Sequence, residues 1–113
     1  MAQFIIHQYK NSKSTVPYLL DIQNDFLEDL ETRLVIPVYP ANVLHGKRMT
    51  KLTPMIEIDG VQYILMIPEL TSISKKYLGA EIINISQHRT MVLSAIDLMV
   101  TGFQVNHCCT HCI

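Results

Sequence analysis

The feature that most constrains the fold is the segment MIEIDGVQYILMI at residues 55–67. Apolar and polar residues alternate on both sides of Asp59-Gly60, which is the period of a half-buried β-strand. Asp-Gly between two such segments is typical of a two-residue hairpin turn, because glycine accepts the positive φ that the turn requires. The segment therefore predicts two antiparallel strands joined by a tight turn.

Other short segments rich in β-branched and aromatic residues are also typical of strands. They are QFIIHQY (3–9), YLLDIQ (18–23), RLVIPV (33–38), SISKKYL (72–78) and AEIINI (80–85), the last two on either side of Gly79. In YLLDIQ we expect Leu20 and Ile22 on one face and Leu19 and Asp21 on the other. Pro37 cannot donate a ladder hydrogen bond, so we expect its strand to lie at an edge or to end there.

The hydrophobic period then changes to that of a helix. From Ser86 to Thr101, one apolar face is formed by Val92, Ala95, Ile96 and Met99. Ser86 is expected to cap the start of this helix and Gly102 to end it. The segments together predict a mainly β domain of the α+β class, with five or more antiparallel strands and one C-terminal helix packed on the sheet.

Composition and charge narrow the class of protein. The 113 residues predict one domain, and 49% hydrophobic against 17% charged residues indicate a folded chain. The apolar run 91–103 is too short to span a membrane, and the N-terminus lacks the pattern of a signal peptide. All three cysteines lie in the last six residues, so we expect a disulfide-free core and a cytoplasmic protein. The net charge of −1 argues against strong direct binding to nucleic acid.

The sequence lacks motifs for covalent catalysis, with no glycine-rich phosphate loop, HExxH or GxSxG. His7, His45 and His88 are scattered, and no carboxylate is spaced to orient any of them as a base. Asp21 and Asp25 could pair as acid and base, but their place between a strand and a loop favours turn-capping. We therefore expect no enzyme activity, no catalytic residue and no cofactor, and the residues alone indicate a small β-rich binding domain.

Three segments resemble the CcdB toxin family: QFIIHQYK (3–10), DIQNDFLEDLETRLVIPVYP (21–40) and AIDLMVTGF (95–103). The resemblance implies an SH3-like small-barrel antiparallel sheet with a C-terminal helix, in a homodimer. It also implies the toxin of a type II toxin–antitoxin pair, which binds DNA gyrase through the gyrase A protein and traps the cleaved-DNA complex. A cognate antitoxin, whose C-terminal segment folds on binding, would neutralise it. The toxin would contact DNA only indirectly, through gyrase or the antitoxin complex.

The resemblance further implies which residues contact gyrase. They are Asn24, Phe26 and Leu27 in the loop after the second strand, and Asp97, Val100, Thr101, Gly102 and Phe103 at the helix end. Phe26 and Leu27 lie in an acidic loop with nothing local to cover them, so a two-fold pair of loops would offer an apolar wedge to a symmetric target. At Thr101 this chain departs from the best-known member, which has a tryptophan as its main poison determinant.

Residues 104–113 continue past the position where the family usually stops. They include His107, Cys108, Cys109, His111 and Cys112, and the Cys109–Cys112 spacing could contribute to a zinc site. Structural zinc sites usually draw ligand pairs from two separated segments, which favours an interpretation without metal. We expect a toxin domain at 1–103 and a Cys/His-containing C-terminal extension at 104–113.

Two other functions stay open at this point. A MazF-like endoribonuclease toxin has the same fold, but it would need a base, an acid and an arginine that converge in a basic groove. An inactive relic would still bind its antitoxin, while Thr101 and the extension would spoil the contact with gyrase.

Overall fold

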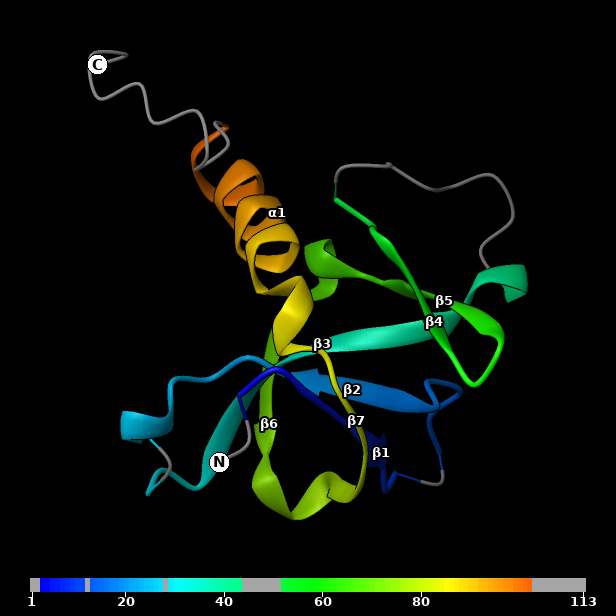
Figure 1. The fold of residues 1–113 in the computed structure, drawn as a ribbon. Coiled ribbons are helices and arrows are strands. Elements are labelled where there is room, and N and C mark those ends of the chain that lie inside the picture. The colour runs from blue at the N-terminus through cyan, green and yellow to red at the C-terminus, as the bar shows by residue number, and fades with distance from the viewer. Residues whose placement is uncertain (1–2, 12, 28, 44–51, 103–113) are drawn as a thin grey trace.

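The computed structural model describes residues 3–11, 13–27, 29–43 and 52–102, which form a curled antiparallel sheet with an α-helix at one end (Figure 1). The strands are β1 (Ile5–Tyr9), β2 (Tyr18–Asp21), β3 (Thr32–Pro40), β4 (Met55–Ile58), β5 (Val61–Leu65), β6 (Thr71–Ser74) and β7 (Leu78–Asn84), and the helix is α1 (Arg89–Thr101). Short 3₁₀ turns connect them: η1 (Asp25–Leu27), η2 (Ala41–Val43), η3 (Ile67–Glu69), η4 (Lys75–Tyr77) and η5 (Ser86–His88). The predicted α+β class, a small barrel made mainly of sheet with a C-terminal helix, is confirmed.

The long strand β3 connects two groups of strands. The order across the sheet is β4-β5-β3-β2-β1-β7, and β6 pairs with the first half of β3. Thr32–Val35 of β3 pair with β6 and Val38–Pro40 pair with β5, while β2 runs along the opposite side. One side of β3 therefore changes partner between Val35 and Val38.

Pro37 lies at this change of partner, and the prediction that it marks an edge strand or a strand end is wrong. The carbonyl oxygen of Pro37 accepts a hydrogen bond from the amide of Met66 at 2.9 Å. Because the N and O of a strand residue point to the same side, the nitrogen of Pro37 also faces away from β2. The N–H that proline lacks would point to the gap between β6 and β5, where neither strand pairs with Pro37. The central strand therefore accommodates the proline without losing a hydrogen bond to β2.

The predicted hairpin is confirmed. Asp59 and Gly60 have φ values of 51° and 81°, the pair of positive angles that a type I′ turn requires between β4 and β5. Gly79, by contrast, lies inside β7, and the chain turns earlier, at η4. A Cβ at Gly79 would lie 3.0 Å from the carbonyl oxygen of Gln8, so glycine here permits the close pairing of β7 with β1.

The C-terminal helix is confirmed, but its start differs from the prediction. Ser86 does not cap α1, because it begins the turn η5 and its amide donates to Asn84 Oδ1 at 2.8 Å. Gly102 ends α1 as predicted, with φ at 81° and its amide bonded to Leu98 O at 2.9 Å. The predicted apolar face packs against the core through Val92, Ala95, Ile96 and Met99. Across the described ranges, no helix has the length and apolar character needed to cross a membrane.

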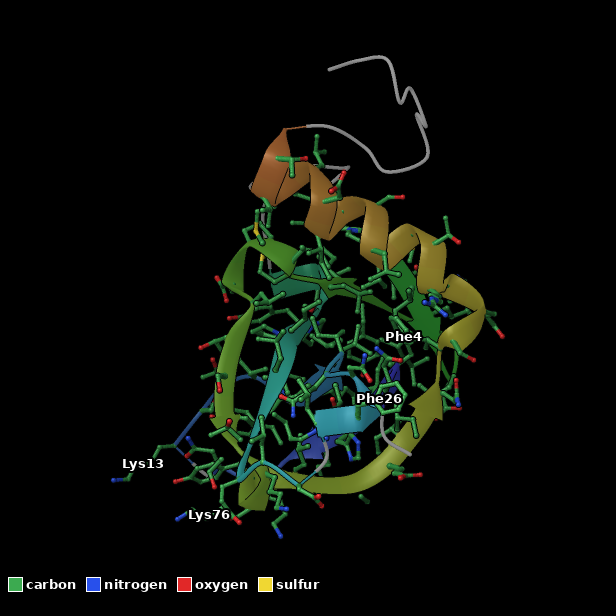
Figure 2. All side chains as sticks on the ribbon, turned by 90° about the vertical axis from the view of Figure 1, so that its left-hand side faces the viewer. Phe4, Lys13, Phe26 and Lys76 are labelled. Atoms are coloured by element: carbon green, nitrogen blue, oxygen red, sulfur yellow. The ribbon has the colours of Figure 1, made fainter. Side chains whose placement is uncertain are left out.

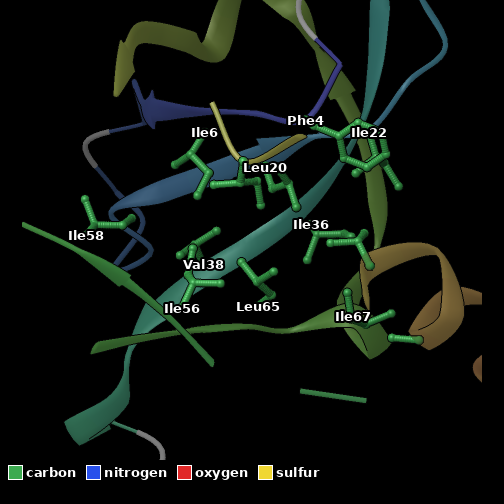
Figure 3. Packing of buried hydrophobic residues seen from close by; sticks show 13 residues of the cluster. Phe4, Ile6, Leu20, Ile22, Ile36, Val38, Ile56, Ile58, Leu65 and Ile67 are labelled. Carbon is green, nitrogen blue, oxygen red and sulfur yellow. The ribbon is translucent and has the colours of Figure 1, made fainter. Parts of the chain in front are cut away.

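Both faces of β2 are buried because the sheet curls around them. The main core, shown in Figure 3, includes Ile6, Leu20, Ile22, Ile36, Val38, Leu65 and Ile67. On the opposite face of the sheet, His7, Leu19, Asp21 and Val35 are buried as well. The predicted alternation within β2 is therefore correct, but neither of its faces is left to solvent.

A buried ion pair joins β2 to β3 on this second face. Arg33 donates from Nε to Asp21 Oδ2 at 2.9 Å and from Nη2 to Asp21 Oδ1 at 3.0 Å. Asp21 is 0% exposed and Arg33 is 4% exposed. Asp21 Oδ1 also accepts the amide of Gln23 at 3.0 Å, which confirms its predicted role in capping a turn. The side chain of Asp25 lies outside the described part of the chain.

Removal of the negative charge from this pair should destabilise the fold strongly. We expect Asp21→Asn to lower the free energy of unfolding by about 3–5 kcal/mol, because Arg33 would stay buried without a counter-charge. Urea denaturation measures this loss. Asp29→Asn is the matched control at an exposed position, and we expect it to change stability by less than about 0.5 kcal/mol. Equal effects of the two substitutions would contradict the role given to the ion pair.

Candidate functional site

The turn η1, which follows β2, displays two of the predicted contact residues. Phe26 is 93% exposed and Leu27 is 48% exposed, and Figure 2 looks onto the side of the molecule that carries Phe26. Leu30 is 49% exposed in the same loop and was not predicted as part of the site. Such side chains contribute little to the stability of the free protein, so this apolar loop has the character of a docking surface.

Asn24, the third predicted residue of the loop, shapes the turn. Its Oδ1 accepts the amide of Phe26 at 2.8 Å, and its carbonyl oxygen accepts the amide of Leu27 at 2.9 Å. A side chain that bonds to the backbone two residues later is a common way to hold a tight turn. The described geometry of Asn24 is therefore that of a residue that orients Phe26.

Two buried residues beneath the turn, Gln23 and Arg33, were not predicted as part of the site. Arg33 Nη2 also donates a hydrogen bond to Gln23 O at 3.4 Å. The two residues of the ion pair therefore both hold the backbone of Gln23, because Asp21 accepts its amide. One signal in the sequence could have indicated this. Arg33 lies near the start of a strand soon after Asp21 ends one, and antiparallel neighbours place such residues close together.

The helix end displays a second exposed group. Val100 is 71% exposed, Thr101 is exposed and Asp97 is half-buried. Thr101 Oγ1 donates to Asp97 O at 2.8 Å, so the hydroxyl bonds within its own helix. Gly102 closes the helix with its left-handed φ, and Phe103 lies outside the described residues.

A single protomer does not bring these two groups together. In Figure 1 the helix end lies at the top of the view and η1 near the bottom, and Figure 2 shows the same separation with Phe26 labelled. Within the described residues, α1 contacts η3 and η5. The loop and the helix end are therefore two separate surfaces of one protomer.

Two of the described titratable groups, His7 and Tyr39, make hydrogen bonds within the fold. His7 is buried and its Nδ1 donates to Gly79 O at 3.2 Å, while His45 lies outside the described residues. Tyr39 donates to Glu69 Oε1 at 2.7 Å; burial, that bond and the charge of Glu69 raise the pKa of Tyr39 to about 12, so its hydroxyl stays protonated at neutral pH. In the described ranges, no group of three or more His, Cys, Asp or Glu side chains could hold a metal. The cysteines and histidines of residues 104–113 fall outside those ranges.

Comparison with known protein families identifies the family to which the chain belongs. The family model described as CcdB protein matches residues 3–102. The match begins before β1, includes η1 with Phe26 and Leu27, and extends through α1 to Gly102. Because it spans most of the chain, this protein belongs to the CcdB family, the toxins of toxin–antitoxin pairs.

Proposed function

We propose that this protein binds the gyrase A protein of DNA gyrase and traps the cleaved-DNA complex, as the toxin of a type II pair. The observation that carries the proposal is the almost complete exposure of Phe26, at a loop position that the resemblance to the family assigns to the gyrase contact. Burial of a phenylalanine side chain contributes roughly 1.5–3 kcal/mol, and the free protein does not gain it here. Docking of Phe26 into an apolar pocket of the target would supply this energy.

The charge around the loop supports a particular kind of pocket. Asp29 and Glu31 are exposed beside Phe26 and Leu27, whereas Arg33 is buried and neutralised by Asp21. The loop therefore presents apolar side chains with acidic neighbours. Electrostatic complementarity favours a target pocket with an apolar floor and a basic rim.

The helix end would provide a weaker contact than in members that carry tryptophan there. Among the described residues of this end, Val100 is the exposed apolar one, and Thr101 offers much less area for burial than an indole ring. The gyrase contact would then depend mainly on the loop. This departure at Thr101 also supports a second candidate, a relic that binds its antitoxin but no longer poisons gyrase.

The remaining partners follow from the same proposal. The toxin acts as a cytoplasmic homodimer, so that two copies of the apolar loop meet a two-fold target. Its cognate antitoxin binds through a C-terminal segment that folds on the toxin. The toxin itself carries out no covalent chemistry and needs no cofactor. It contacts DNA only indirectly, through gyrase or the antitoxin complex.

Expression of the protein without antitoxin should arrest growth, and a resistant gyrase A protein should relieve the arrest. Phe26→Ala should weaken binding to a purified fragment of the gyrase A protein by about 30-fold or more, as expected for a central apolar anchor. Val61→Ala is the matched control, because Val61 is also exposed but lies on the β4–β5 hairpin. Equal binding by the two variants would refute the loop contact. Unhindered growth with antitoxin binding intact would establish the relic.

The ribonuclease alternative has a simple test of its own. Purified protein incubated with a long RNA in the absence of metal should leave the RNA intact, because a gyrase poison needs no convergent base and acid. Gel electrophoresis of the RNA gives the result. Cleavage at specific sites would overturn the gyrase proposal in favour of a MazF-like nuclease.

We also propose that residues 1–103 are the toxin domain and that residues 104–113 are an extension. Deletion of 104–113 should leave folding and antitoxin binding nearly unchanged, because α1 is already closed by the bond from Gly102 N to Leu98 O. Gyrase inhibition should be equal or stronger, since fixing ten residues in a complex would cost on the order of ten kcal/mol, at roughly 1–2 kcal/mol per residue.

Thermal unfolding, antitoxin binding and metal analysis test the deletion together. An unfolded truncated protein, or the loss of one equivalent of zinc that the full chain carries, would show that the extension is structural.

A further inference from the structure

Gln23 is buried directly beneath the exposed turn and uses all of its hydrogen-bonding groups. It is 7% exposed, although a glutamine side chain is ordinarily found at the surface. Its Nε2 donates to Leu27 O at 2.9 Å, and its Oε1 accepts the amide of Leu34 at 3.0 Å. One side chain therefore links the end of η1 to strand β3.

The backbone of Gln23 is held by the ion pair. Its amide donates to Asp21 Oδ1 at 3.0 Å, and its carbonyl oxygen accepts from Arg33 Nη2 at 3.4 Å. Buried and mutually bonded groups of this kind have little freedom to rearrange. Gln23 is thus fixed from below by Asp21 and Arg33, and it fixes the turn above.

The bond to Leu27 closes the loop immediately after Phe26. Leu27 O accepts from Gln23 Nε2 and also from the amide of Leu30 at 3.1 Å. The other side of the turn is set by Asn24, whose Oδ1 holds the amide of Phe26. Phe26 lies between these two attachments, so its backbone has a defined direction even though its side chain contacts solvent.

We infer that Gln23 is a positioning residue, which pre-organises Phe26 for docking into a partner; this inference rests on the proposed binding of gyrase. A loop that adopts the binding conformation for a tenth of the time binds about tenfold more weakly. Gln23 keeps the loop in that conformation before the partner arrives. It touches no partner itself, because it is buried beneath the turn.

Gln23→Met tests this inference, since methionine has a similar length and makes neither side-chain hydrogen bond. We expect faster amide hydrogen exchange at Leu27 and Leu30, with the amides of β1 and β7 unchanged. We expect binding to a fragment of the gyrase A protein to weaken by about tenfold, which corresponds to about 1.4 kcal/mol. Antitoxin binding should be retained. Gln62→Met, an exposed glutamine on β5, is the matched control and should change none of these quantities.

Gln23→Glu provides a second test that does not depend on the stability of the methionine variant. A protonated carboxyl can donate to Leu27 O and accept from Leu34 N, as the amide does, whereas an ionised carboxylate can only accept. The charged groups that face this position are Asp21 and Arg33. Binding by this variant should be nearly normal at mildly acidic pH and should weaken as pH rises, while the unaltered chain shows a much smaller change.

The outcomes separate the inference from the proposed function. If Phe26→Ala leaves gyrase binding unchanged, the proposed loop contact fails. If Phe26→Ala weakens binding but both Gln23 variants bind and exchange like Gln62→Met, the loop contact stands and the positioning role is refuted. Weak binding and fast exchange in a folded Gln23 variant establish the positioning role.

Discussion

The buried ion pair between Asp21 and Arg33 is the contact on which the sheet and the exposed loop after β2 both depend. It fixes the register of β2 against β3, because a slip of one residue would turn Arg33 to the opposite face and leave Asp21 buried without a partner. The same carboxylate caps the amide of Gln23, where the chain leaves the strand. The position of the exposed turn is therefore determined by the same charges that align the strands.

Local signals in the sequence predicted the elements whose geometry is set locally. Asp59-Gly60 could be assigned to a turn because positive φ is a property of those two residues, and Gly102 could be assigned to a helix end for the same reason. Pro37 could not be assigned in this way. The free-energy cost of proline in a strand depends on whether a neighbouring strand would accept a hydrogen bond at that position. For Pro37, this depends on where the partner of β3 changes from β6 to β5. Ser86 was misassigned because Asn84, two residues earlier, bonds to its amide instead.

The candidate site was predictable in part. The family resemblance pointed to Phe26 and Leu27, and an acidic loop with uncovered apolar residues is visible in the sequence. The support beneath them was indicated only by the short separation of Asp21 and Arg33 along the chain, because its hydrogen bonds join residues of different strands. Gln23 bonds to Leu34, eleven positions later, and Arg33 bonds to Asp21, twelve positions earlier. Such contacts follow from the register of two strands, which hydrophobic alternation alone does not specify.

The separation of the two exposed surfaces has a consequence for how this toxin would bind. The loop is held by β2 and β3, whereas the helix end is closed by its own backbone and its helix rests on η3 and η5. Distant surfaces usually contribute to binding almost independently, to within about 0.3–0.5 kcal/mol. In the proposed complex, the smaller side chain of Thr101 would therefore leave the contribution of the loop unchanged. Most of the apolar area for the proposed contact would then come from the loop, where Phe26, Leu27 and Leu30 are exposed.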